Sequence, residues 1–165
     1  MGVRKVEQIS GRVGGEAAGF DLELTWDGTR LKGRVGGAVV GKDVNLSLHS
    51  GFVTGRVGGS LEGFDVAGSL QPHAVEVRFG GNTLGQDLRL ELSRGQVRGR
   101  LGGSLIGNDV ALEHSGEQLS GRIGGRRDGK DVRLSTQAPP EVAALAAAIA
   151  FQLFEESAAG AGSSG

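Results

Sequence analysis

The chain contains no cysteine and only three prolines among its 165 residues. Without cysteine it can have no disulfide framework, no thiolate metal site and no thiol nucleophile. The low proline content and the absence of a Gly-X-Y triplet exclude a collagen-like chain, although glycine reaches 32 residues. The glycines therefore indicate a fold with many turns.

Charge of one sign is not in excess either, since 18 Lys and Arg residues nearly balance 19 Asp and Glu residues. Such a surface does not attract nucleic acid through its bulk charge. The N-terminal residues lack the apolar segment of a secretory signal. The apolar segment 142–154 is shorter than the ~17 to 25 residues that a membrane crossing needs. We therefore expect a cytoplasmic protein and leave peripheral attachment to a membrane open.

Six copies of a 22-residue unit fill most of the chain without an insertion. The units start at Gly11, Gly33, Gly55, Val77, Gly99 and Gly121. In every unit the second residue is Arg, the eleventh is Asp, and glycine occupies positions four, five and nine. Internal repetition of this kind indicates a repeat architecture, so the structure of one unit decides the fold.

Each unit contains two segments in which apolar and polar residues alternate, as in Leu22-x-Leu24-x-Trp26. Alternation with period two is typical of an antiparallel strand with one buried face. Gly-Gly-x-x-x-Gly joins the first segment to the second, and pairs such as Asp27-Gly28 mark the return turns. Each unit is therefore predicted to be a β-hairpin.

One irregularity tests the register of these hairpins. Five units begin with Gly and five carry Leu at position fourteen, and the two exceptions are Val77 and Gly68. A four-residue turn from Gln71 to Ala74 would place Gly68 opposite Val77. Cross-strand neighbours share one volume, so the large and the small residue have exchanged sides as packing requires.

Six hairpins supply twelve strands, and closing the last strand, near residues 130–136, onto the first, near residues 6–13, would remove two exposed edges. A barrel of twelve strands is too wide for its own side chains to fill. The segment 142–154 carries only one polar side chain, Gln152, so it is suited to a buried position.

We therefore predict an all-β fold with one helix. It is a closed antiparallel up-and-down β-barrel around a C-terminal helix, residues 141–156. The helix begins after Pro139 and Pro140, which suit a first helical turn. Residues 1–157 form one domain, and residues 158–165 form a flexible tail rich in Gly, Ala and Ser.

A parallel β-solenoid capped by the helix is the alternative fold. In that fold the six repeated Asp residues would stack about 4.7 Å apart, as would the six Arg residues, and like charges in a ladder are unfavourable. In the barrel each Arg lies diagonal to an Asp, and the pairs form a belt on the outer face that fixes the register. The belt residues are Arg12, Asp21, Arg34, Asp43, Arg56, Asp65, Arg78, Asp87, Arg100, Asp109, Arg122 and Asp131.

A twelve-stranded barrel around an apolar C-terminal helix resembles the tubby and phospholipid-scramblase group, and the short Gly-rich hairpins resemble the bacterial β-flower barrels. The resemblance covers about residues 6–156. It rests on the Gly-Arg-Val-Gly-Gly and Gly-x-Asp-Val-x-Leu repeats and on the terminal helix. The resemblance implies a binding module and suggests phosphoinositide-like head groups as ligands. No ligand motif of the tubby group matches this chain residue by residue, so the resemblance carries over no binding residues.

The sixth unit differs from the others in its charge. Its cations are Arg122, Arg126, Arg127, Lys130 and Arg133. Such a cluster around one turn can receive a phosphate or an anionic lipid head group. If the helix emerges at the same rim, Glu155 and Glu156 would instead form salt bridges with Arg126 and Arg127.

Other motifs indicate no site. Gly-Gly-x-x-x-Gly-x-Asp resembles the calcium-binding repeats of RTX β-rolls, but each unit offers one dependable carboxylate, whereas calcium takes about six to eight oxygens. No helix begins after these glycines, so they are not a phosphate-binding loop. His49, His73 and His114 lie near return turns without an acidic or nucleophilic partner at a repeated spacing, so we assign them no metal or acid–base role.

We expect a non-enzymatic binding module whose partner is an anionic lipid or a membrane surface. Catalysis would need a few residues that break the repeat in one place, and the cluster that does so is basic. We expect no metal or cofactor, identify no small-molecule substrate or nucleic-acid partner, and expect a monomer, with an oligomer left open. A structural scaffold is the alternative function, and a calcium-binding repeat protein is a more remote one.

Overall fold

The computed structural model describes residues 5–15, 18–36, 41–59, 63–80, 85–102, 107–125 and 129–163, with the side chains of the helix as far as residue 157. Twelve strands precede one helix, α1 (Pro140–Ser163). The strands are β1 (Glu7–Gly14), β2 (Gly19–Trp26), β3 (Arg30–Gly36), β4 (Gly41–His49), β5 (Phe52–Gly58), β6 (Gly63–Leu70), β7 (Ala74–Phe79), β8 (Gln86–Ser93), β9 (Gln96–Gly102), β10 (Gly107–Ser115), β11 (Gln118–Ile123) and β12 (Lys130–Thr136).

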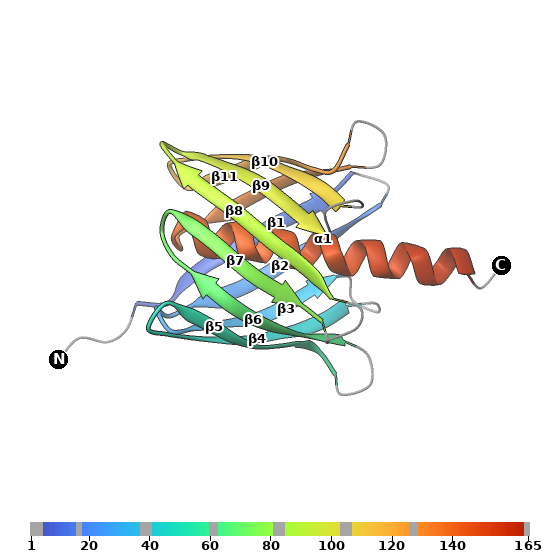
Figure 1. Ribbon diagram of the computed structural model, residues 1–165, viewed down its shortest axis with the longest axis horizontal. Coiled ribbons are helices and arrows are strands. Elements are labelled where there is room, and N and C mark those ends of the chain that lie inside the picture. The colour runs from blue at the N-terminus through green and yellow to red at the C-terminus, as the bar shows by residue number, and fades with distance from the viewer. Residues whose placement is uncertain are drawn as a thin grey trace.

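The strands form a closed antiparallel barrel in which each strand pairs with the next along the chain and β12 pairs with β1. This topology confirms the predicted up-and-down barrel and excludes the solenoid. Figure 1 shows α1 passing through the barrel from one end to the other. We call the end where α1 begins and the odd-numbered strands start the turn rim, and the end where α1 emerges the loop rim.

The predicted exchange between the third and fourth units is confirmed, because Gly68 lies opposite Val77. The turn between these strands closes through two backbone hydrogen bonds between Gln71 and Ala74, in which each N–H donates to the other carbonyl, at 2.9 and 3.3 Å. The large residue of this pair therefore stands on β7 instead of the preceding strand.

The predicted diagonal arrangement of Arg and Asp is wrong. Each belt Arg lies directly opposite the Asp of its own unit, as Arg12 lies opposite Asp21. The glycines at the ends of the two strands fix this register, because Gly14 pairs with Gly19 and the charged residues stand two positions further from the loop on each strand.

The glycine that begins most units faces the interior, where two strands approach too closely for a side chain. A Cβ on Gly33 would clash with the carbonyl oxygen of Glu23 and would lie 2.9 Å from the side chain of Leu24. The backbone there has a φ of 148°, which favours glycine. Where the third unit meets the fourth, Gly68 takes this role, since its Cβ would lie 2.6 Å from the Cα of Val77.

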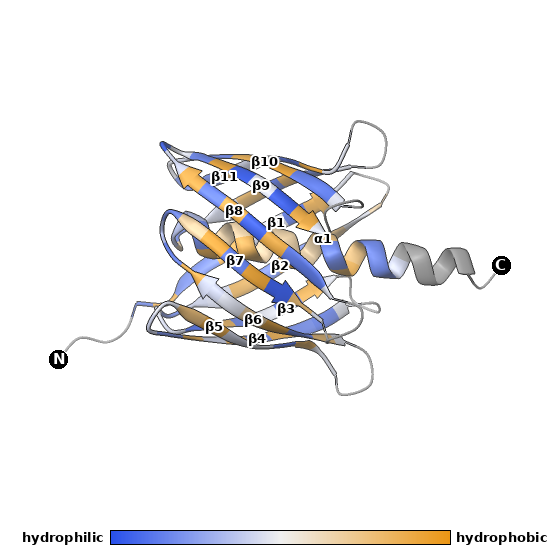
Figure 2. Ribbon diagram, in the orientation of Figure 1, coloured by the Kyte–Doolittle hydropathy of each residue, from blue (hydrophilic) through white to orange (hydrophobic). Residues whose placement is uncertain are grey.

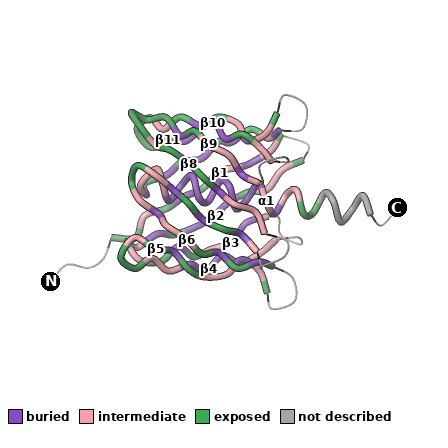
Figure 3. The backbone as a smooth tube through the Cα atoms, in the orientation of Figure 1, coloured by how far each residue is buried: buried purple, intermediate pink, exposed green. Residues whose placement is uncertain are grey.

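The core consists of the helix and the inward side chains of the strands. Residues 142–151 of α1 are each at most 1% exposed. In Figure 2 the apolar colour lies on the part of α1 inside the barrel, and Figure 3 shows this part as buried. Its many alanines keep the helix slim, while each buried Leu, Ile or Phe contributes about 1.5 to 3 kcal/mol.

The helix is longer than predicted, because it continues to Ser163 instead of ending near residue 156. Alanine favours the helix, and Gln152 Nε2 donates a hydrogen bond to Glu156 Oε1 at 3.1 Å across one turn. The backbone of the predicted tail is therefore helical through residue 163. Within the described residues, no helix has both the length and the hydropathy of a membrane-spanning segment.

Candidate functional site

The structure describes three of the predicted cations of the sixth unit, and it places Lys130 apart from the other two. Arg122 on β11 and Arg133 on β12 stand on the outer face of the barrel, whereas Lys130 alternates with them and faces inward beside buried Val132. Lys130 therefore does not join Arg133 in one site, because successive residues of a strand point to opposite faces. Arg126 and Arg127 lie outside the described residues.

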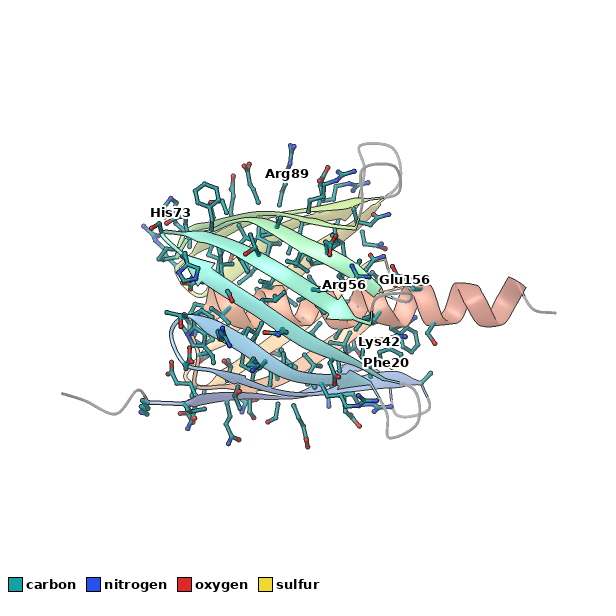
Figure 4. The ribbon with its side chains drawn as sticks, turned by 90° about the horizontal axis from the view of Figure 1, so that it is seen from below. Phe20, Lys42, Arg56, His73, Arg89 and Glu156 are labelled. Atoms are coloured by element: carbon teal, nitrogen blue, oxygen red, sulfur yellow. The ribbon has the colours of Figure 1, made fainter. Side chains whose placement is uncertain are left out.

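Lys130 instead lies against the helix where α1 leaves the barrel. Its Nζ is 5.2 Å from the centre of the Phe154 ring, which is a cation–π distance. Phe154 also meets the edge of Phe20, with ring centres 5.4 Å apart. Figure 4 shows Phe20, Lys42 and Glu156 close to this mouth. The helix thus emerges beside the sixth unit, which is the condition for the alternative with salt bridges, and aromatic contacts help to hold it there. The predicted salt bridges to Arg126 and Arg127 involve residues outside the described part.

The belt of ion pairs encircles the barrel near the loop rim. All six Arg–Asp pairs have Nη1 to Oδ1 distances of 2.7 to 3.0 Å. In the three units whose position-five glycine the structure describes, the Arg Nε also donates to the carbonyl of that glycine, as Arg56 does to Gly59 at 2.9 Å. The Asp side chains are 45 to 82% exposed, so each pair contributes only about 0 to 1 kcal/mol.

Arg133 departs from this balance. It lies directly opposite Arg12 on β1 and Ser120 on β11. Its diagonal neighbours on these two strands are Ser10, Gly14, Gln118 and Arg122. None of these residues carries a carboxylate, and Asp131, two positions earlier on β12, already binds Arg122 at 2.7 Å. Within the described part of the chain, the side chain of Arg133 has no ion pair.

Arg89 on β8 provides a comparison, because it also lies opposite an arginine, Arg100 on β9. On its other side, however, it faces Glu76 on β7. Figure 4 shows Arg89 pointing away from the barrel. Arg133 differs from Arg89 in having no carboxylate opposite or diagonal to it on either neighbouring strand.

We call the outward residues around Arg133 the seam patch, because they lie where the first and last strands meet. The seam patch consists of Arg12, Arg133, Ser10, Ser120 and Ser135. A surface hollow of about 420 Å³ reaches Ser10 and Ser135 from the turn rim, where Glu117 also lines it, and neither arginine does. The sequence pattern indicated Arg133 as part of an anion site and Arg12 only as part of the ion-pair belt, because it does not specify the register that pairs β1 with β12.

The remaining candidates form no site. Among the described residues, no three His, Asp or Glu side chains come together as a metal site would need. The repeated Asp residues, which the calcium alternative would use, are each bound by an Arg. His49 and His73 are exposed near the turn rim, and His114 is half-buried on the inward face of β10.

The geometry thus describes a plugged barrel with a balanced belt and one unbalanced cationic patch. Comparisons with known proteins add no family to this description, because no family model, no curated protein and no solved structure matches the chain.

Proposed function

We propose that this protein is a non-enzymatic binding module that associates with anionic groups, such as lipid head groups at a membrane, through its outer surface. The observation that carries this proposal is the filled interior, since residues 142–151 are at most 1% exposed. In the part of the chain that the structure describes, the helix occupies the interior of the barrel that a ligand would need. Any partner must therefore bind outside or at a rim.

The choice of an anionic partner is supported by the charges on the outer face. Each belt Arg is paired with an Asp, Arg12 with Asp21 included, whereas Arg133 opposite Arg12 has no carboxylate opposite or diagonal to it. Each Arg or Lys near an anionic membrane contributes about 1 kcal/mol to attraction, and the effect falls within a Debye length. The resemblance to the tubby and phospholipid-scramblase group agrees with such a role.

Sedimentation with lipid vesicles tests the proposal. The full chain is mixed with phosphatidylcholine vesicles that contain or lack phosphatidylserine, at low and at high salt. We expect retention only on the phosphatidylserine vesicles and release by salt. Arg126→Ala/Arg127→Ala should weaken retention, whereas the matched control Arg30→Ala/Lys32→Ala should not, because it removes equal charge from β3. Equal retention on both vesicle types would refute the proposal.

A structural scaffold is the second candidate, and two exposed apolar side chains favour it. Phe52 and Val6, which stand near the turn rim, are 62% and 55% exposed. Such residues can join copies of a rigid barrel. Light scattering separates the candidates, because a stable oligomer that ignores lipid and dissociates in Phe52→Ser would favour the scaffold.

A further inference from the structure

We propose that the seam patch binds a tetrahedral oxyanion, a phosphate or sulfate group, which bridges β1 and β12 and thereby stabilises the closed barrel. This inference rests on the proposed function and gives the anionic partner a site and a chemical class. It also adds a consequence, because occupation of this site links the two ends of the chain.

The first argument is electrostatic. Arg12 and Arg133 are direct cross-strand partners, so their Cβ atoms are about 4.5 to 5.5 Å apart, and like charges at this separation are unfavourable. Asp21 offsets only one of the two charges, through its 2.8 Å contact with Arg12. A divalent or monovalent oxyanion between the guanidinium groups would remove the repulsion.

The second argument concerns the available donors. Arg12 uses Nη1 for Asp21 and Nε for the carbonyl of Gly15, which leaves its Nη2 for a ligand. The guanidinium of Arg133 makes no hydrogen bond to a described residue, so its full fork of N–H groups is available. Guanidinium groups bind phosphate and sulfate oxygens in pairs, and this planar geometry suits two arginines that flank one anion.

Three serines complete the site with neutral donors. Ser10 and Ser135 are cross-strand partners next to the Arg12–Arg133 pair, and Ser120 lies opposite Arg133 from the other side. Ser135 Oγ accepts a hydrogen bond from Gln118 Nε2 at 3.2 Å, so its own hydroxyl hydrogen can point to a ligand. The hydroxyl groups of these serines can donate hydrogen bonds to an anion held by the two arginines, and they carry no negative charge that would repel it.

The position of the patch connects binding to closure. Every other strand pair joins consecutive strands, whereas β1 and β12 join the first strand to the last. Their pairing closes the longest loop of the chain and has the largest entropic cost of any strand pair. An anion that binds only when both arginines are together must therefore favour the closed barrel by mass action.

Thermal unfolding of the full chain tests this inference. The protein, Arg133→Ser and the control Arg89→Ser are heated in sodium phosphate and in sodium chloride of equal ionic strength. The control also removes an arginine opposite another arginine, but at a strand pair away from the seam. We expect phosphate to raise the Tm of the parent protein and of Arg89→Ser, and to leave the Tm of Arg133→Ser unchanged.

Hydrogen exchange locates the effect. Phosphate should slow exchange of the amides in β1 and β12 more than in β5 and β6, and Arg133→Ser should abolish this difference. If Arg133→Ser does not fold, Ser120→Ala replaces it, and a reduced phosphate effect is then expected. An equal rise of Tm in all variants would overturn the inference, because phosphate would then act as a general stabilising salt.

A vesicle arm with the same proteins separates free phosphate from a lipid source. Loss of phosphatidylserine retention in Arg133→Ser, together with the loss of the phosphate effect, supports both proposals. A phosphate effect without vesicle retention supports the oxyanion site and refutes the membrane role. If Arg133→Ser is still retained on the vesicles and phosphate raises the Tm of none of the proteins, the oxyanion site is refuted and the proposed function stands.

Discussion

The exchange of Gly68 and Val77 offers a direct test of how the barrel sets its register. The test compares Gly68→Leu, Val77→Gly and the double variant with the parent protein. The double variant would restore the pattern of the other units, in which the leucine of one strand lies opposite the glycine of the next, as Leu24 lies opposite Gly33.

Each single change should be costly. Val77 is 3% exposed, so Val77→Gly loses about 1.5 to 3 kcal/mol of burial and about 0.5 to 1 kcal/mol from added chain entropy. Gly68→Leu places a Cβ 2.6 Å from the Cα of Val77 at a φ of 158°. Overpacking costs about 1 to 3 kcal/mol and backbone strain of this kind costs a similar amount.

The double variant should lose less than the sum of the two. Glycine at position 77 would let the backbone take the conformation of the other units, and leucine at position 68 would then fill the volume that Val77 leaves, as Leu24 does over Gly33. We therefore expect a coupling energy of about 2 kcal/mol or more. Urea denaturation followed by circular dichroism measures the free energy of unfolding of all four proteins. Losses that add within about 0.5 kcal/mol would show that these residues do not share one volume.

Three further outcomes follow from the core and the belt. Truncation after Gln137 should abolish cooperative unfolding, because it empties the barrel; a truncated chain that remains soluble, folded and equally stable would show that α1 is not the core. Phe151→Ala should lower the free energy of unfolding by about 3 to 5 kcal/mol, whereas exposed Glu156→Ala should change it by less than about 0.5 kcal/mol, and urea denaturation measures both. Asp65→Asn breaks the 2.8 Å pair with Arg56 and should cost no more than about 1 kcal/mol in urea denaturation, a difference that should shrink in high salt.

The strand order could be predicted because each unit repeats the same local signals. Alternating apolar residues give the buried face of every strand, and the glycine pairs mark where the chain reverses. The irregular pair Gly68 and Val77 then fixed the alignment of two strands, since only one register places them opposite each other. The helix could be placed because an apolar segment without a polar stripe has to be buried.

The details that the sequence did not predict depend on geometry at element ends. The Arg–Asp pairs are direct and not diagonal because Gly14 pairs with Gly19, which the residue pattern does not specify. The predicted end of α1 came too early in the chain. Beyond the loop rim the helix needs no contact with the barrel, so only the weak helix propensity of the residues acts there. Lys130 faces inward because it alternates along β12 with the same parity as buried Val132, and its partner Phe154 comes from the helix.

Position thirteen of the unit explains why Arg133 is informative. This outward residue lies opposite the belt arginine of the next unit, and it is Glu23, Asn45, Ala67, Arg89, Ala111 or Arg133. Such variety shows that packing does not require arginine there. A carboxylate would suit the fold better, as Glu23 does opposite Arg34. At the seam the chain instead places Arg133 opposite Arg12, which weakens the one strand pair that closes the barrel. An anion bound between the two side chains would replace this repulsion with attraction to both guanidinium groups. Arginine at position 133 is therefore explained by ligand binding and not by the stability of the barrel.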